Sequence, residues 1–257
     1  MTTNRYEVIP GAESFYLQGN EIGILLIHGF VGTPQSVKFV GKQLAEKGFT
    51  VLAPRLKGHG THFKELEETT YQDWLLELEQ AYFKLKSVCS HVFIAGQSMG
   101  GVLSLLLANK VKPSGVITLN AAFSVPGYEI YKNEIDTKYV HEGKPDIKDD
   151  SVIEISYPSV PVHAIKQLLT LIDIGKENLA HITCPLLLFK SLEDHVVPAE
   201  STDYIYENVS SLQKEVVALT NSYHVASMDY DKFNIVDQTE YFILNSIADT
   251  TKHVKVS

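Results

Sequence analysis

The chain has 257 residues, enough for one large α/β domain or for one domain with an insertion. Hydrophobic residues make up 44% of it, as in a globular protein with a substantial core, and the net charge of −9 argues against a nucleic-acid partner or an anionic membrane surface. The sequence contains neither an apolar run of about 18 residues, as a bilayer-spanning helix needs, nor the apolar core of a signal peptide. Two cysteines, Cys89 and Cys184, are too few for a disulfide framework or a metal site, so a reduced, cytoplasmic protein is the simplest interpretation.

Strands and helices are predicted to alternate along the chain. Short apolar runs typical of buried parallel strands occur at residues 22–27, 49–53, 91–95, 115–120, 185–190 and 215–219. Helical patterns begin at Pro34, surround Trp74, follow Ser98 and cover residues 231–247. The repeated strand–helix order predicts an α/β fold with a mostly parallel sheet and helices on both faces.

The stretch from residue 121 to residue 182 interrupts this alternation. Its first part is charged and irregular, whereas residues 162–174 have the pattern of an amphipathic helix. A structureless loop of this length would be improbable in a compact domain. We therefore predict an inserted, partly helical lid at 121–182, and a core formed by residues 1–120 and 183–257.

The pentapeptide at residues 96–100 (GQSMG) has the G-x-S-x-G pattern. Apolar runs precede and follow it, which predicts a strand, a sharp turn and a helix, the context of a nucleophile elbow. In such a turn the hydroxyl of Ser98 projects clear of the sheet, and the flanking glycines avoid collisions. The helix directs its positive end toward the place where an anion would develop. Because the bare pattern also occurs by chance, the assignment depends on the partners of Ser98.

A serine hydroxyl is a weak nucleophile at neutral pH, so it needs a base and a carboxylate that orients the base. In this fold class the chain order is Ser, then Asp or Glu, then His. Asp194 and His224 follow the last two predicted strands, at the same sheet edge as Ser98. Ser98, Asp194 and His224 are therefore the predicted triad, with Glu193 and Asp203 as alternatives for the acid.

An attacked carbonyl gains negative charge, which preorganised N–H donors stabilise. The backbone N–H of Met99, next to Ser98, is the first expected donor. The second is expected in the loop after the first strand, where residues 28–32 (HGFVG) follow the apolar run, and the N–H of Phe30 is the candidate. A simple glycine turn is the alternative reading of that loop.

Three further histidines invite a functional assignment. His59 and His62 lie in a KGHGTH segment that could suggest a metal, but no third or fourth ligand is evident nearby, so a structural turn is the preferred interpretation. His195, beside Asp194, is interpreted as a bystander. The sequence predicts no metal and no organic cofactor.

Taken together, these motifs resemble those of the bacterial monoacylglycerol lipases and their relatives, small carboxylesterases of the α/β-hydrolase fold. The resemblance spans most of the chain. It is carried by residues 25–30 (LLIHGF), 54–62 (PRLKGHGTH), 96–100 (GQSMG), 193–198 (EDHVVP) and 221–226 (NSYHVA).

The resemblance implies the same triad and oxyanion hole, and a mobile lid that shapes a channel for an acyl chain. It also implies that Ile147 is a lid residue that faces the substrate. One position departs from the family, whose lid carries a glutamate that hydrogen-bonds glycerol just after the tyrosine matching Tyr157. Here that position is Pro158, which offers neither a carboxylate nor an N–H.

The expected function is hydrolysis of small-molecule acyl esters, above all monoacylglycerols, through an acyl-enzyme. The departure at Pro158 keeps a second expectation open, a broad carboxylesterase or thioesterase without glycerol selectivity. A protein of the same fold that binds ligands without catalysis is the alternative of another class.

Overall fold

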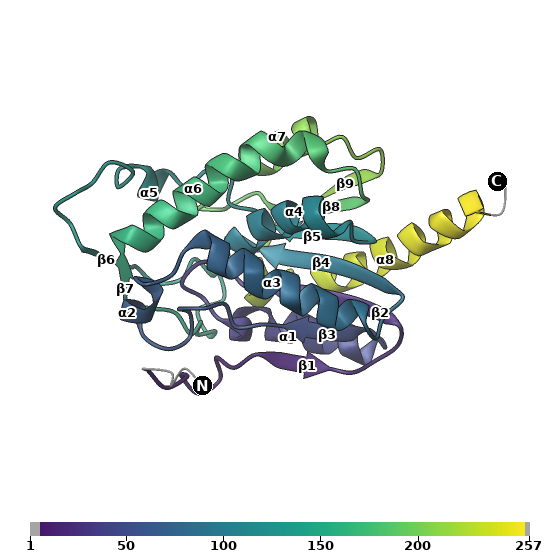
Figure 1. Cartoon of the computed structure of the whole chain (residues 1–257), viewed down its shortest axis with the longest axis horizontal. Coiled ribbons are helices and arrows are strands. Elements are labelled where there is room, and N and C mark those ends of the chain that lie inside the picture. The colour runs from purple at the N-terminus through teal and green to yellow at the C-terminus, as the bar shows by residue number, and fades with distance from the viewer. Residues whose placement is uncertain (1–5, 255–257) are drawn as a thin grey trace.

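The computed structural model describes residues 6–254, and its centre is a seven-stranded sheet (Figure 1). In spatial order the strands are β1 (Phe15–Leu17), β3 (Thr50–Ala53), β2 (Ile22–Ile27), β4 (His91–Gln97), β5 (Gly115–Leu119), β8 (Leu186–Ser191) and β9 (Lys214–Leu219). β1 runs antiparallel to β3, and the other neighbours in this sheet are parallel. The predicted α/β class and the six predicted strands are confirmed. The sequence pattern does not predict β1, because three residues are too few to show a period.

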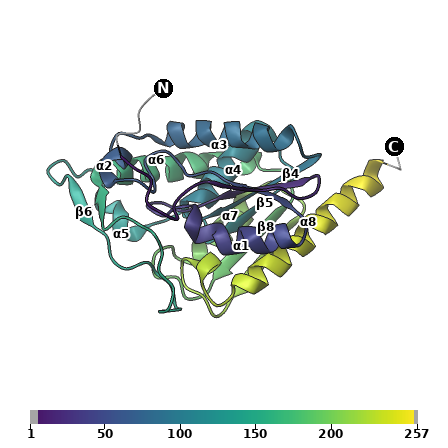
Figure 2. The same cartoon turned by 90° about the horizontal axis from the view of Figure 1, so that it is seen from below.

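Helices cover both faces of the sheet (Figure 2). α1 (Pro34–Glu46) and α8 (Lys232–Val254) pack on one face, and α3 (Tyr71–Lys86) and α4 (Met99–Val111) pack on the other. Neighbouring strand residues point to opposite faces, so Leu25 joins one hydrophobic cluster and Leu26 the other. Burial on both faces explains why the strands read as continuous apolar runs. α8 extends past the predicted end at residue 247, because neither glycine nor proline follows there.

Short elements fill the connections. α2 (Phe63–Leu66) follows β3, α7 (Glu200–Asn208) follows β8, and the 3-10 helix η2 (Ala226–Met228) follows β9. Among residues 6–254 we find no helix whose length and hydropathy would suit a bilayer crossing.

The segment 121–182, hereafter the insertion, lies between β5 and β8. It contains α5 (Pro126–Glu129), β6 (Tyr139–His141), β7 (Ser159–Pro161), α6 (Val162–Asn178) and the 3-10 helix η1 (Leu179–His181). β6 and β7 form an antiparallel pair that the sequence pattern does not predict. α6 packs against α4 so closely that a Cβ on Gly175 would lie 2.9 Å from Val102. The C-terminal part of the insertion is therefore built into the hydrophobic core.

Candidate active site

The sharp turn between β4 and α4 carries Ser98. Its φ of 56° and ψ of −120° are unusual for a residue with a side chain, and such strain is typical of functional turns. The two glycines of the motif permit the turn because a Cβ on Gly96 would lie 2.0 Å from the carbonyl oxygen of Gly100, and one on Gly100 would lie 2.5 Å from that of Ile27. The pentapeptide thus adopts the predicted elbow.

The structure brings the three predicted triad residues into contact. Nε2 of His224 lies 2.8 Å from Oγ of Ser98, and Nδ1 of His224 lies 2.8 Å from Oδ2 of Asp194. Oδ1 of Asp194 accepts backbone N–H bonds from Val196 and Val197 at 2.9 and 2.8 Å. The side chain of Asp194 is only 2% exposed and that of His224 8% exposed, so the carboxylate is held rigidly away from water.

Neither alternative acid contacts His224. Glu193 pairs with Nζ of Lys148 at 3.1 Å and is more than half exposed. Asp203, on α7, pairs with Nζ of Lys190 at 2.6 Å. Asp194 is therefore the carboxylate that orients the imidazole.

The two candidate oxyanion donors are the backbone N–H of Met99, next to Ser98 in the sequence, and that of Phe30, in the loop after β2. Among residues 6–254, no acceptor takes the backbone N–H of Phe30 or of Met99. His28 holds the Phe30 loop in place, with Nδ1 2.8 Å from the Gly29 carbonyl oxygen and Nε2 accepting the Leu56 N–H at 3.2 Å. Burial lowers the pKa of His28 to about 4, so its ring is neutral and can donate from one nitrogen and accept at the other. This bridge between two loops has no local signature in the sequence.

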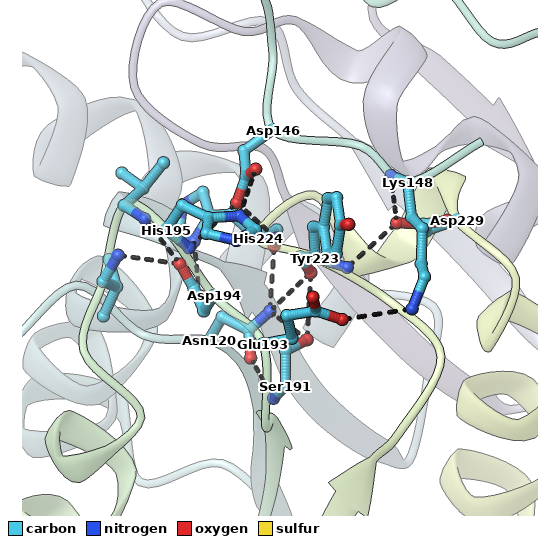
Figure 3. Close-up of polar contacts among 12 residues, drawn as sticks. Asn120, Asp146, Lys148, Ser191, Glu193, Asp194, His195, Tyr223, His224 and Asp229 are labelled. Atoms are coloured by element: carbon cyan, nitrogen blue, oxygen red, sulfur yellow. Dashed lines mark hydrogen bonds and ion pairs between the residues drawn. The ribbon is translucent and has the colours of Figure 1, made fainter. Parts of the chain in front are cut away.

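The loop of His224 is supported from the sheet by Asn120, at the end of β5. Its Nδ2 donates to the carbonyl oxygen of His224 and to Oγ of Ser191, each at 2.9 Å. Its Oδ1 accepts the N–H of Ser191 at 2.8 Å. Figure 3 shows Asn120 below the histidine and Asp146 of the insertion above it. Both side chains lie outside the motifs and were not among the predicted site residues.

His195 contacts the insertion rather than the triad. Its Nδ1 lies 2.8 Å from Oδ1 of Asp146, and this hydrogen bond raises the pKa of His195 above its usual value. The ring nitrogens of His224 pair with Ser98 and Asp194, not with His195, whose interpretation as a bystander stays a prediction.

A pocket of about 100 Å³ opens beside Ser98, between the core and the insertion. Its walls combine apolar side chains with the acids Glu142 and Glu154 of the insertion. Tyr128 donates a hydrogen bond to Glu142 at 2.7 Å, and burial raises the pKa of both groups. A larger cavity, about 410 Å³, lies beside Lys112 at the opposite end of the strands and contains none of the triad.

Glu154 lines the pocket beside Ser98, is partly exposed and has no hydrogen-bond partner among the described residues. Burial raises the pKa of its carboxyl to about 7, and the nearby His224 acts in the opposite direction. Its Oε1 comes so close to Gly32 that a Cβ there would lie 2.8 Å away. An acid without a partner thus faces the catalytic pocket.

The two predicted lid residues do not line this pocket in the structure. Pro158 is exposed, and Ile147 is partly buried. The neighbouring Tyr157 turns toward the core, where its hydroxyl donates to the carbonyl oxygen of Gly58 at 2.8 Å. A role of Ile147 and Pro158 in substrate binding therefore stays a prediction.

The two histidines of the KGHGTH segment lie in a turn. His59 is buried, its ring packs edge-on against Phe30 and Trp74, and burial lowers its pKa well below the usual value. Nδ1 of His62 accepts the N–H of Lys64 at the start of α2. In the part of the chain that the structure describes, we find no group of three or more His, Cys, Asp or Glu side chains that could hold a metal ion.

Comparison with known proteins agrees with this geometry. A model of the family described as serine aminopeptidase, S33 matches residues 20–139 and 130–231. A thermostable monoacylglycerol lipase from a Bacillus species is 41% identical over 245 residues, which are 93% of this chain and 98% of the relative. A carboxylesterase from Bacillus subtilis is 29% identical, over 91% of this chain and 96% of the relative.

Solved structures give the same result. A structure from the study of the metagenome-derived lipolytic enzymes LipS and LipT superposes with a TM-score of 0.90 at 38% identity, covering 93% of this chain and all of that one. A monoglyceride lipase from Saccharomyces cerevisiae, at 17% identity and a TM-score of 0.80, shares the fold. The chain therefore belongs to the serine aminopeptidase, S33 family, in its branch of bacterial monoacylglycerol lipases and carboxylesterases, and is a carboxylic ester hydrolase of the α/β-hydrolase fold.

Proposed function

We propose that this enzyme hydrolyses monoacylglycerols and related acyl esters through an acyl-enzyme on Ser98. The observation that carries the proposal is the continuous pair of 2.8 Å contacts from Ser98 through His224 to Asp194. The likeness to a monoacylglycerol lipase over nearly the whole chain supports the substrate class.

In the proposed mechanism, His224 takes the proton of Ser98 as Oγ attacks the ester carbonyl. The backbone N–H groups of Phe30 and Met99 hold the oxyanion, and His224 then protonates the leaving alcohol. A water molecule activated by His224 releases the acid from Ser98. Asp194 stays ionised and stabilises the imidazolium, so these steps need no metal or organic cofactor.

The insertion acts as the lid in this proposal. Its apolar residues Val125 and Leu168 line the pocket with Phe30 and provide a surface suited to an acyl chain. Glu154 is the polar group offered to a hydroxylated leaving alcohol, in place of the acid that is missing at Pro158. The compartment is proposed to be reducing and cytoplasmic, which the free thiols of Cys89 and Cys184 support.

Replacement of the nucleophile tests the proposal. Ser98→Ala should lower kcat on a p-nitrophenyl ester of butyric acid by about 10³-fold or more, because the attacking atom is removed. A fluorophosphonate probe should label the wild type at residue 98 and leave the variant unlabelled. Circular dichroism serves as the control for an intact fold.

Two results would contradict the proposal. Turnover by Ser98→Ala at the wild-type rate would mean that another group attacks the ester. A wild type that takes no probe and cleaves no ester would instead favour a protein that only binds ligands.

A further inference from the structure

Residues 145–149 of the insertion lie against the loop that carries His224 (Figure 3). Oδ2 of Asp146 accepts the backbone N–H of His224 and that of His195, each at 3.1 Å. Its Oδ1 lies 2.8 Å from Nδ1 of His195, and its own carbonyl oxygen accepts the N–H of Val225 at 3.0 Å. One residue of the insertion thus holds both loops that carry the triad's acid and base.

The core holds the insertion in return through Asp229, which is fully buried. Its Oδ2 accepts the N–H of Lys148 at 2.8 Å and that of Tyr223 at 2.9 Å. Its Oδ1 accepts the N–H of Asp149 at 3.2 Å. Nζ of Lys148 also lies 5.3 Å from the centre of the Tyr223 ring. Each side therefore contributes a carboxylate that binds backbone N–H groups of the other.

These contacts leave the catalytic base little freedom. The N–H of His224 is bound by Asp146 and its carbonyl oxygen by Asn120, while both ring nitrogens face triad partners. A displacement of about 1 Å in a catalytic group can cost about 10²-fold in rate. The side chain of Asp146 is only 15% exposed, so its hydrogen bonds compete little with water.

We propose that Asp146 is a positioning residue for the catalytic histidine, and that it fastens this part of the lid to the core. The inference rests on the proposed roles of Ser98, Asp194 and His224. It implies that residues 146–149 stay in place when a substrate binds.

The test uses four variants of the full chain. Asp146→Ala should lower kcat on p-nitrophenyl butyrate by about 10- to 100-fold and change KM by less than about threefold, because the base is misplaced and binding is kept. Asp146→Asn should recover most of this loss, since one amide oxygen can still accept both N–H bonds. His195→Ala, which keeps those two bonds, should stay within about threefold of the wild type. Asp150→Ala is the matched control, because this exposed acid of the insertion makes no side-chain hydrogen bond or ion pair among the described residues.

Hydrogen exchange gives a readout besides turnover. The amides of His224 and Val225 should exchange faster in Asp146→Ala than in the wild type and in Asp150→Ala. If Asp146→Ala does not fold, the same comparison is made with Asp146→Ser, whose shorter side chain cannot reach both N–H groups and should therefore show the same faster exchange and lower kcat relative to Asp150→Ala.

The inference is overturned if the wild type is active and Asp146→Ala keeps the kcat of Asp150→Ala. It is overturned as well if Asp146→Ala raises KM and leaves kcat unchanged, because Asp146 would then contact the substrate instead of positioning the base. A wild type without ester turnover would contradict the proposed function instead, and the exchange rates would still report whether the loop is held.

Discussion

At the scale of single residues, Glu154 is the most unusual group in the site. It faces the pocket without a hydrogen-bond partner among the described residues, and burial raises the pKa of its carboxyl from 4.5 to about 7. An acid whose pKa is raised in the folded state holds its proton more tightly there than in the unfolded chain. Wild-type stability should therefore fall as the pH rises from 4.5 through 7.

Glu154→Gln should remove the free-energy cost of burying an ionised carboxylate at this position. Below pH 4.5 the carboxyl is protonated in both states, so variant and wild type should differ little in their free energy of unfolding. Above pH 7 the variant should be more stable, by at most about 3 kcal/mol. Denaturant unfolding at pH 4.5 and pH 8.5 measures the difference.

Glu207→Gln, which makes the same chemical change on the exposed side of α7, is the control. If Glu154→Gln raises the free energy of unfolding equally at both pH values, the effect does not come from ionisation.

At the scale of elements, the elbow depends on how closely α4 approaches β2. A Cβ on Gly100 would lie 2.5 Å from the carbonyl oxygen of Ile27 and 2.7 Å from that of His28. Backbone atoms cannot yield as a flexible side chain would, so α4 would be pushed away from the loop that carries Phe30. The geometry of the proposed oxyanion hole and the packing of α4 therefore depend on the same glycine.

Gly100→Ala should lower the free energy of unfolding by about 3 kcal/mol and reduce kcat in the fraction that folds. Gly127→Ala, in α5, is the matched control, because nothing lies within 4 Å of a Cβ built there. Thermal unfolding compares the two variants. Equal melting temperatures would mean that the elbow relaxes without cost.

At the scale of the whole molecule, we expect substrate choice to depend on the pocket where the insertion meets the core. The pocket there, about 100 Å³, is smaller than the roughly 300 Å³ at which ligand pockets begin. We therefore expect the insertion to shift when an acyl ester binds. The wall of the pocket carries Glu154 and the Tyr128–Glu142 pair, which can exchange hydrogen bonds with hydroxyl groups.

Glycerol monoesters should accordingly be cleaved faster than ethyl esters of the same fatty acid, by about tenfold in kcat/KM, because a hydrogen bond to an ionised partner contributes about 1.5 kcal/mol. Initial rates at a fixed acyl length measure the ratio. Equal values would assign the enzyme to the broad carboxylesterases and would make Pro158 the decisive departure.

The sequence by itself determined the α/β architecture and the elbow, and it predicted the three residues that the structure brings into contact as a triad. Continuous apolar runs predict buried parallel strands, and Phe30, Ser98, Asp194 and His224 each come shortly after one of them, so their place at the sheet edge could be inferred without coordinates. The close packing around Ser98 can also be inferred from the sequence, because the two glycines of its motif indicate a turn without room for side chains.

The tertiary structure alone decided how the base is held and which lid residues reach the pocket. Asp146 and His224 are 78 positions apart, and Asn120 and His224 are 104 apart. A hydrogen bond across such a distance leaves no periodic pattern, because any polar residue in a loop could make it or could face water instead. For the same reason the sequence does not predict that Glu154 lines the pocket, since its neighbours come from both the core and the insertion. Nor does it predict that His28 connects two loops.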